Sequence, residues 1–122
     1  MRQIKKHYKD GLKFDSKLEL FFYNLLNKEG IEFEFQVPYQ LFPSFKYDGK
    51  TVRAMTLTVD FDFTAHGRNI IVDTKGFQRN DNILKWKIFR YIMAADWGKQ
   101  PKLFFPKNQK ECAEVVEIIK GL

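Results

Sequence analysis

Apolar residues recur along the first part of the chain with two different periods, one helical and one extended. Over residues 15–27 they return at three- and four-residue steps until Gly30 ends the run, which predicts a first helix. Residues 31–37 alternate apolar and polar side chains, as a half-buried strand does. Pro38 and Pro43 then interrupt the alternation, so the strand is expected to stop there.

The centre of the sequence predicts strands joined by tight turns. Residues 47–50, Tyr-Asp-Gly-Lys, have turn chemistry and precede a second strand that runs from about Val52 through Phe63. A second candidate turn, His-Gly-Arg-Asn at 66–69, leads into a short apolar strand over 70–75. These two strands are expected to pair as a hairpin through the second turn.

The C-terminal part predicts a helix, a short strand and a last helix. The first of these helices follows Asp81 or Asn82 as its cap and is apolar over a broad face. Residues 102–105 form a short strand between two prolines, and Asn108 caps a helix that ends near Lys120. The expected fold is therefore α/β in the broad sense (α+β), a mixed β-sheet flanked by helices in the order α-β-β-β-α-β-α.

Length and charge limit what this fold can do. A chain of 122 residues is expected to form one domain over 14–122, preceded by a basic N-terminal arm over 1–13 that either follows phosphates or is a solvated, partly disordered terminus. No apolar run approaches the roughly 20 residues that span a bilayer, so a cytoplasmic protein is expected. The net charge of +6 favours a polyanionic partner such as nucleic acid. Anionic membranes attract the same charge, but the helices lack the lysine-rich polar face of an interfacial helix.

The single cysteine and the aromatic residues of the C-terminal part are interpreted as structural. Cys112 cannot form an internal disulfide or a Cys-rich zinc site, and its helical spacing from neighbouring apolar residues predicts burial. Trp86, Phe89, Tyr91 and Trp97 also have spacings typical of a core or a subunit interface rather than of a base-stacking surface.

Acidic side chains concentrate where the two central strands would meet. Alternation along residues 57–63 puts the odd-numbered apolar side chains on one face, so Asp60 and Asp62 are expected to share the other. Asp62 is expected to be a solvent-exposed charge at the end of its strand, with the alternative that it holds a water molecule near the site. The next strand puts Asp73 and Lys75 on one face where the apolar run ends.

If those strands form a hairpin, Asp60 and Asp73 approach closely, and two like charges need a cation or a proton to offset their repulsion. Mg²⁺ takes oxygen ligands and is usually held by one or two carboxylates together with substrate phosphate, so phosphodiester hydrolysis is the natural reaction. An ordinary cross-strand ion pair with Lys75 explains the same residues, and from the residues alone the two interpretations stand level.

Three segments together resemble the PD-(D/E)XK nuclease superfamily. Thr-Val-Asp-Phe at 58–61 and Val-Asp-Thr-Lys-Gly at 72–76 are similar to its central motif, and Ser-Lys-Leu-Glu at 16–19 is similar to the helical acidic residue that precedes it. The resemblance covers roughly residues 14–87. It is nearest to phage-encoded Holliday-junction-resolving enzymes of the endonuclease I type, and more distant to the end-cleaving nuclease subunits of transposons.

The resemblance implies a restriction-endonuclease-like fold and a role for each matching residue. Asp60 and Asp73 would be metal ligands together with the backbone carbonyl of Thr74, Lys75 would be the catalytic lysine, and Glu19 would be a further acidic residue at the metal. Ser16 and Glu19 also fit a capping box, in which the glutamate returns to the start of its helix, whereas capping by Asp15 would release it inward. The superfamily's proline before the aspartate is Val59 here, which removes no ligand.

The expected function is a Mg²⁺- or Mn²⁺-dependent DNA endonuclease that acts as a homodimer on branched DNA such as four-way junctions. The resemblance also implies a phage origin. A nicking or end-processing subunit of a larger complex, and a nucleic-acid-binding module without catalysis, are the alternatives. The residues expected to contact the DNA backbone are basic or polar and lie in the arm or after the motif. They are Lys5, Lys6, Lys9, Lys13, Gln78, Arg79, Lys85 and Lys87.

Overall fold

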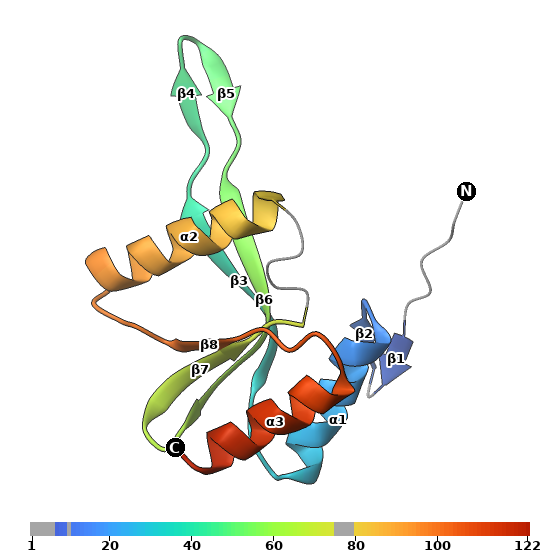
Figure 1. Cartoon of the computed structure of the whole chain (residues 1–122). Helices are drawn as coiled ribbons and strands as arrows, with labels where there is room; N and C mark the ends of the chain where they lie inside the picture. Colours follow the sequence, from blue (N-terminus) through green and yellow to red (C-terminus); the bar gives the residue numbers. More distant parts are fainter. Residues whose placement is uncertain (1–6, 10, 75–79) are drawn as a thin grey trace.

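The fold is built on a four-stranded mixed sheet with helices on both faces (Figure 1). It is seen in a computed structural model that describes residues 7–9, 11–74 and 80–122. The strand order is β3-β6-β7-β8, antiparallel except for the parallel pair β7 and β8, which α2 connects. The elements of this core are α1 (Lys17–Lys28), β3 (Glu34–Phe42), β6 (Met55–Ala65), β7 (Arg68–Val72), α2 (Asn80–Ala95), β8 (Lys102–Phe104) and α3 (Gln109–Lys120).

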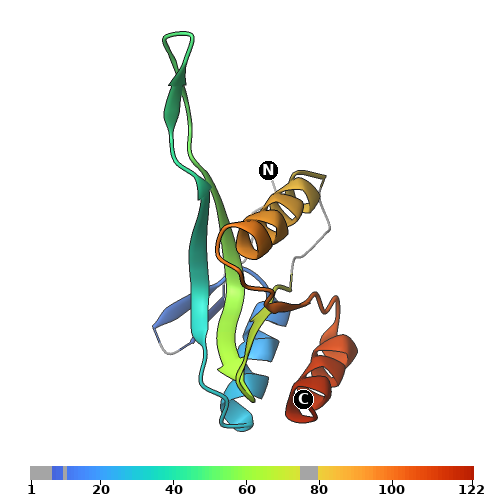
Figure 2. The same ribbon diagram turned by 90° about the vertical axis from the view of Figure 1, so that its left-hand side faces the viewer.

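The core elements follow the predicted α-β-β-β-α-β-α order, which is confirmed, and two small hairpins are added to it. The first, β1 (His7–Lys9) with β2 (Leu12–Phe14), begins in the expected basic arm over 1–13 and ends at Phe14, the first residue of the expected domain. The second, β4 (Phe45–Tyr47) with β5 (Lys50–Val52), extends beyond the sheet in line with β3 and β6 (Figure 2). Within the described ranges, no helix is long and apolar enough to cross a membrane.

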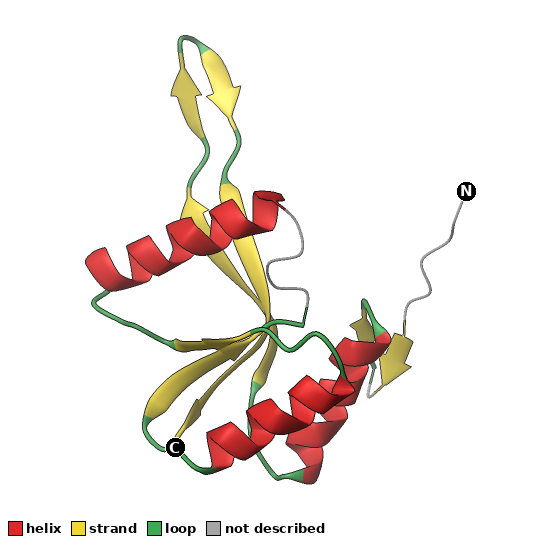
Figure 3. Cartoon of the chain, in the orientation of Figure 1, coloured by secondary structure: helices red, strands yellow, loops and turns green. Residues whose placement is uncertain are grey.

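Two hydrophobic clusters lie on opposite faces of the sheet. One is covered by α1 and α3, which pack side by side and contribute Phe22 and Val116. The other is covered by α2, whose Trp86 and Phe89 are almost completely buried. In Figure 3 the helices accordingly form two layers with the strands between them. Cys112 is buried in the first cluster, as predicted.

Two of the aromatic side chains interpreted as core or interface residues lie on the surface of the chain. Tyr91 is 70% exposed and Trp97 is 50% exposed, whereas Trp86 and Phe89 pack edge to face beneath α2. Tyr91 lies two residues after Phe89 in the helix, so its side chain points away from the sheet. The spacing of the aromatic residues in the sequence did not distinguish these two faces of the helix. A place in the core is therefore confirmed for Trp86 and Phe89 only.

The long strands β3 and β6 change layers near their midpoints. Val59 packs in the cluster under α2, yet Phe61, two residues later, packs in the cluster against α1 and α3. In the paired strand Val37 and Phe35 divide in the same way, and Gln36 between them has a left-handed backbone with φ of 53°. The expectation that the odd-numbered residues of 57–63 share one face is therefore wrong, because regular alternation stops at this point.

Two further features of the strands follow from backbone chemistry. His66 and Gly67 have φ of 54° and 75°, the paired positive values of a tight hairpin turn, so the predicted hairpin between β6 and β7 is confirmed. Pro38 does not end the first strand as expected but lies within β3, opposite Thr58. Because β3 is an edge strand, its missing N–H is tolerated there.

Phe61 should be a main support of this core. It is fully buried and contacts the rings of Phe22, Phe33 and Phe35, so Phe61→Ala is expected to lower the free energy of unfolding by about 3–5 kcal/mol. Phe45→Ala is the matched control, since Phe45 is 46% exposed and should lose less than about 1 kcal/mol. Urea titration of both variants tests this, and equal losses would contradict the assignment of the core.

Candidate active site

A pocket of about 500 Å³ opens where β6 changes layers, between the N-terminal end of α2 and the start of α1. Asp60 and Asp73, the two carboxylates that were expected to lie close together, both line this pocket. Its wall continues along β6 as far as Thr56. The other lining residues are Lys13, Asp15, Gln36, Leu57, Thr58, Asn82, Lys85 and Trp86.

The pairing of β6 with β7 sets the distance between the two aspartates. Phe61 lies opposite Val72 in this antiparallel pair, so Asp60 and Asp73 occupy the next opposed positions along the two chains. Asp73 is held at the end of β7 by its backbone N–H, which donates to the carbonyl of Phe104 in β8 at 3.0 Å. The aspartate on one strand is thus placed by a hydrogen bond to a third strand.

Thr74 fixes the orientation of the Asp60 carboxylate. Its backbone N–H and its hydroxyl both donate to Asp60 Oδ2, each at 2.8 Å. Both residues are buried, so water competes little for these bonds. The carboxylate cannot rotate without breaking two hydrogen bonds at once.

Glu19 enters the site from the first turn of α1. Ser16 is the N-cap of this helix and its hydroxyl accepts from the Glu19 N–H at 3.1 Å, so the cap is Ser16 and not Asp15. The Glu19 side chain is nevertheless fully buried, and its Oε1 accepts from the Asp15 N–H at 3.3 Å and from Gln36 Nε2 at 3.2 Å. Ser16 therefore caps the helix while the Glu19 side chain is buried, so the two alternatives considered for Glu19 occur together.

All the buried polar and charged side chains of the described part of the chain meet at this one place. They are Glu19, Asp60, Asp73 and Thr74, and each is less than a tenth exposed. Burying a carboxylate is unfavourable unless hydrogen bonds, a proton or a cation compensate for the lost hydration. Three of them at the junction of the two hydrophobic clusters therefore indicate a functional arrangement rather than a packing one.

The surroundings of Asp60 strongly favour its protonated form. Burial, followed by the repulsion from the Glu19 carboxylate, raises the pKa of Asp60 to about 7, and a side-chain hydrogen bond with Glu19 acts in the same direction. The two hydrogen bonds from Thr74 oppose this rise but do not cancel it. A cation that binds at Asp60 would take the place of the proton, so the site is suited to exchange one for the other.

The donor set fits a hard divalent cation. Asp60 and Asp73 supply two carboxylates from opposed strands, which is the usual number of protein ligands for Mg²⁺. Among the residues that the structure describes, the acidic, histidine and cysteine side chains do not form a metal-binding group of three or more. An ion held by these two carboxylates would take its remaining oxygen ligands from outside the pair, and Glu19 lies beside Asp60.

Several predicted functional residues can be placed, and others lie outside the described ranges. Lys13 and Lys85 line the pocket, and Lys85 Nζ donates to the Thr56 carbonyl at 3.3 Å. Lys87 is exposed on α2 and does not line the pocket. The residues outside the described ranges are Lys5, Lys6, Lys75, Gln78 and Arg79, and the same holds for the side chain of Lys9.

Asp62 does not belong to this site. Its carboxylate accepts hydrogen bonds from the Tyr39 hydroxyl and from Asn69 Nδ2, the latter at 2.8 Å, and it lines a different pocket. The prediction that it shares a face with Asp60 as a solvent-exposed charge is wrong, because the strand changes layers between the two aspartates. Burial and the Asp62 hydrogen bond raise the pKa of Tyr39, and the pair links the neighbouring strands β3 and β6.

Gln36 is the site residue that the sequence did not reveal. It orients Glu19, lines the pocket and donates through Nε2 to the Lys13 carbonyl at 3.1 Å, which ties the β1–β2 hairpin to the site. In the sequence it is only the polar member of an alternating strand. Gln36 has a left-handed backbone conformation, which the sequence could not predict because glutamine rarely adopts it.

Comparison with known proteins yields one match. A family model described as "Protein of unknown function (DUF1064)" matches residues 2–103, a range that contains Glu19, Asp60 and Asp73 and ends within β8. No curated protein matches the chain, and no solved structure does.

Asp60→Asn should stabilise the metal-free protein in a pH-dependent way. Because the pKa of Asp60 is raised in the folded state, the unfolded chain loses its proton first, and stability falls as the pH rises from about 4 to about 7. The variant lacks this loss, so its advantage should grow over that range and stay constant above it. The advantage should reach a few kcal/mol at most, since one pKa unit corresponds to about 1.4 kcal/mol.

Thermal or urea unfolding of both proteins in EDTA between pH 4 and pH 8 measures this difference. Asp48→Asn is the matched control, because Asp48 is an exposed carboxylate in a turn with φ of 51°, a conformation that asparagine tolerates. A difference that shrinks with rising pH would contradict the raised pKa.

Proposed function

This chain belongs to the DUF1064 family, and we propose that it is a metal-dependent DNA endonuclease whose centre is formed by Asp60, Asp73 and Glu19 with Lys75. The proposal is carried by one observation: the buried Asp60 and Asp73 line one pocket, the buried Glu19 lies beside Asp60, and Asp73 is two residues before Lys75 in the sequence. The resemblance of residues 58–61 and 72–76 to the PD-(D/E)XK motif supports the same conclusion independently.

Each residue has a task in this proposal. Asp60 and Asp73 hold the ion, and Thr74 keeps Asp60 in a single orientation through its two hydrogen bonds. Glu19, fixed by Gln36 and by the Asp15 N–H, keeps negative charge next to Asp60 and so favours a cation there. Lys75 supplies the positive charge that favours negative charge on the scissile phosphate.

Mg²⁺ or Mn²⁺ would supply Lewis-acid stabilisation of the phosphate and would lower the pKa of an attacking water. Asp60 must lose its proton before it can act as a ligand, which at a pKa of about 7 takes place near neutral pH. Lys13 and Lys85 at the pocket wall place positive charge where the phosphates flanking the scissile bond would pass.

We further propose branched DNA, such as a four-way junction, as the substrate, and a homodimer as the active species. The junction preference rests on the resemblance alone. The homodimer follows from the reaction, because resolving a junction takes two paired incisions and this domain has one centre per chain.

Asp60→Asn and Asp73→Asn should each lower the rate of DNA cleavage at least about 100-fold, because each removes a negatively charged ion ligand without changing the size of the side chain. Single-turnover cleavage of a labelled four-way junction and of a matching linear duplex, in Mg²⁺ and in EDTA, measures the loss. Junction cleavage that is faster than duplex cleavage supports the substrate assignment.

Asp62→Asn is the position-matched control, since Asp62 lies two residues from Asp60 but lines another pocket. It should keep its cleavage rate within about threefold of wild type. If wild type binds DNA but fails to cut in Mg²⁺ and in Mn²⁺, the chain is a binding module and not a nuclease. If Asp62→Asn is as inactive as Asp60→Asn, the pocket has been assigned wrongly.

Mn²⁺ should raise the melting temperature of wild type more at pH 8 than at pH 6. A proton at Asp60 competes with the ion below the raised pKa of about 7, and an ion that binds only the folded state stabilises it by mass action. Differential scanning fluorimetry with and without Mn²⁺ at both pH values measures the shift. Asp60→Asn should show little shift at either pH, and an equal shift in wild type and variant would place the ion elsewhere.

A further inference from the structure

The β4–β5 hairpin and the residue after it, Phe45–Arg53, form an arm that stands away from the domain (Figure 2). Every residue from 43 to 54 is exposed, and within the described part of the chain no helix or other sheet covers the ribbon. An isolated two-stranded hairpin is marginally stable in water, and this one also exposes Phe45, Tyr47 and Val52. Such a surface indicates a partner that binds along the ribbon.

We propose that this arm is a DNA-binding element that contacts the substrate duplex within about one helical turn of the scissile phosphate. The inference rests on the proposed nuclease function and adds to it the surface that holds the flanking duplex. A two-stranded ribbon is narrow enough to enter the major groove of B-DNA.

The charge of the arm fits a nucleic acid better than a protein surface. It carries Lys46, Lys50 and Arg53 against one carboxylate, Asp48. Lys50 lies opposite Tyr47 and Lys46 lies opposite Thr51, so the two lysines project from opposite faces of the ribbon. Cations on both faces suit a ribbon that has phosphates on either side, whereas docking onto one protein surface would need only one face.

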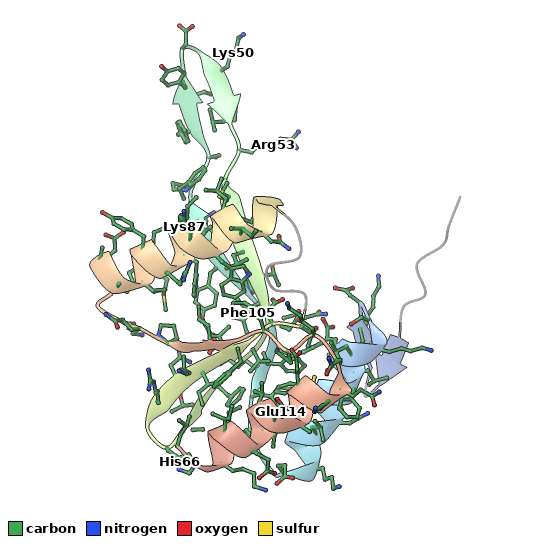
Figure 4. The ribbon with its side chains drawn as sticks, in the orientation of Figure 1. Lys50, Arg53, His66, Lys87, Phe105 and Glu114 are labelled. Carbon is green, nitrogen blue, oxygen red and sulfur yellow. The ribbon has the colours of Figure 1, made fainter. Side chains whose placement is uncertain are left out.

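Only Ala54 separates the arm from the strand that carries Asp60. Strand β6 begins just after Arg53 and carries Asp60, and the pocket wall follows this strand from Asp60 back to Thr56. Lys85 donates a hydrogen bond to the Thr56 carbonyl, so its positive charge lies between the pocket and the arm. Figure 4 shows Lys50 and Arg53 extending away from the ribbon, at its tip and at its base.

The length of the arm sets where on the DNA it would bind. Asp60 lies eleven residues after Gly49 at the tip, so at about 3.3 Å per residue the tip is at most about 36 Å from Asp60. One turn of B-DNA is about 34–36 Å long. Arg53 at the base lies seven residues from Asp60, at most about 23 Å away, which corresponds to about seven base pairs.

The test compares two triple variants with wild type in binding to a labelled four-way junction in EDTA, so that cleavage does not enter. The arm variant is K46A/K50A/R53A, and the control is K28A/K107A/K110A, which removes three exposed lysines from α1, α3 and the loop before α3. Circular dichroism and the melting temperature verify that both variants fold.

The arm variant should bind at least tenfold more weakly than wild type, and the slope of log Kd against log salt should fall by about 2–3, as for the loss of two or three phosphate contacts. The control should stay within about twofold of wild type. Hydroxyl-radical footprinting should show that the arm variant loses protection five to ten base pairs from the cleavage position, as about one helical turn requires, and keeps it around the scissile phosphate.

A second pair of variants tests the aromatic tip. Tyr47 and Tyr91 are 72% and 70% exposed, so Tyr47→Ala and Tyr91→Ala remove the same side chain at equal exposure from the arm and from α2. Tyr47→Ala should weaken binding several-fold, and Tyr91→Ala should leave it unchanged.

The outcomes separate this inference from the nuclease proposal. If the arm variant binds and is footprinted like the control while wild type cuts DNA, the arm does not contact DNA and the nuclease stands. If the arm variant loses self-association in sedimentation together with DNA affinity, the arm joins two copies of the chain and the inference fails. If wild type neither binds nor cuts DNA, both proposals fall together.

Discussion

The structure depends on the point where β3 and β6 pass from one hydrophobic layer to the other. A regular strand buries alternate residues on one face, but here Val59 and Phe61 are buried on different faces, and Asp60 between them is buried as well. The Asp60 side chain belongs to neither hydrophobic cluster. It can hold a carboxylate only because Thr74 donates two hydrogen bonds to it and because α1 brings Glu19 and its own hydrogen-bonding partners to the same place.

The raised pKa of Asp60 follows directly from this constraint. A carboxylate at a strand surface would stay hydrated, whereas one enclosed by two clusters and faced by a second carboxylate retains its proton to about pH 7. In the proposed function, the ion that displaces this proton also removes the repulsion that burial created. The burial of neighbouring carboxylates would then both destabilise the metal-free protein and favour binding of a cation. Functional sites often lower stability in this way.

The sequence predicted the order of the core elements, the hairpin through His66 and Gly67, the N-cap at Asn108 and the pairing of Asp60 with Asp73, because each has a local signal in periodicity or turn chemistry. It did not predict the β1–β2 hairpin, the continuation of β3 through Pro38, the exposure of Tyr91, or the separation of Asp62 from the site. These depend on which strand lies at an edge and where a strand changes layers, and such properties arise only when distant segments pack. Gln36 is the clearest example, since a polar residue in an alternating strand pattern does not predict a left-handed backbone conformation.

The hydrogen bond from the Asp73 N–H to the Phe104 carbonyl has a consequence for the time at which the site forms during synthesis. Glu19, Asp60 and Asp73 all leave the ribosome before β8, but the end of β7 is held in place only when β8 has paired beside it. A nascent chain that stops short of β8 therefore contains every acidic residue of the site and lacks the contact that positions one of them. Assembly of the candidate centre therefore waits until β8 has been synthesised, so that chains ending before β8 would hold the acidic residues without their final arrangement.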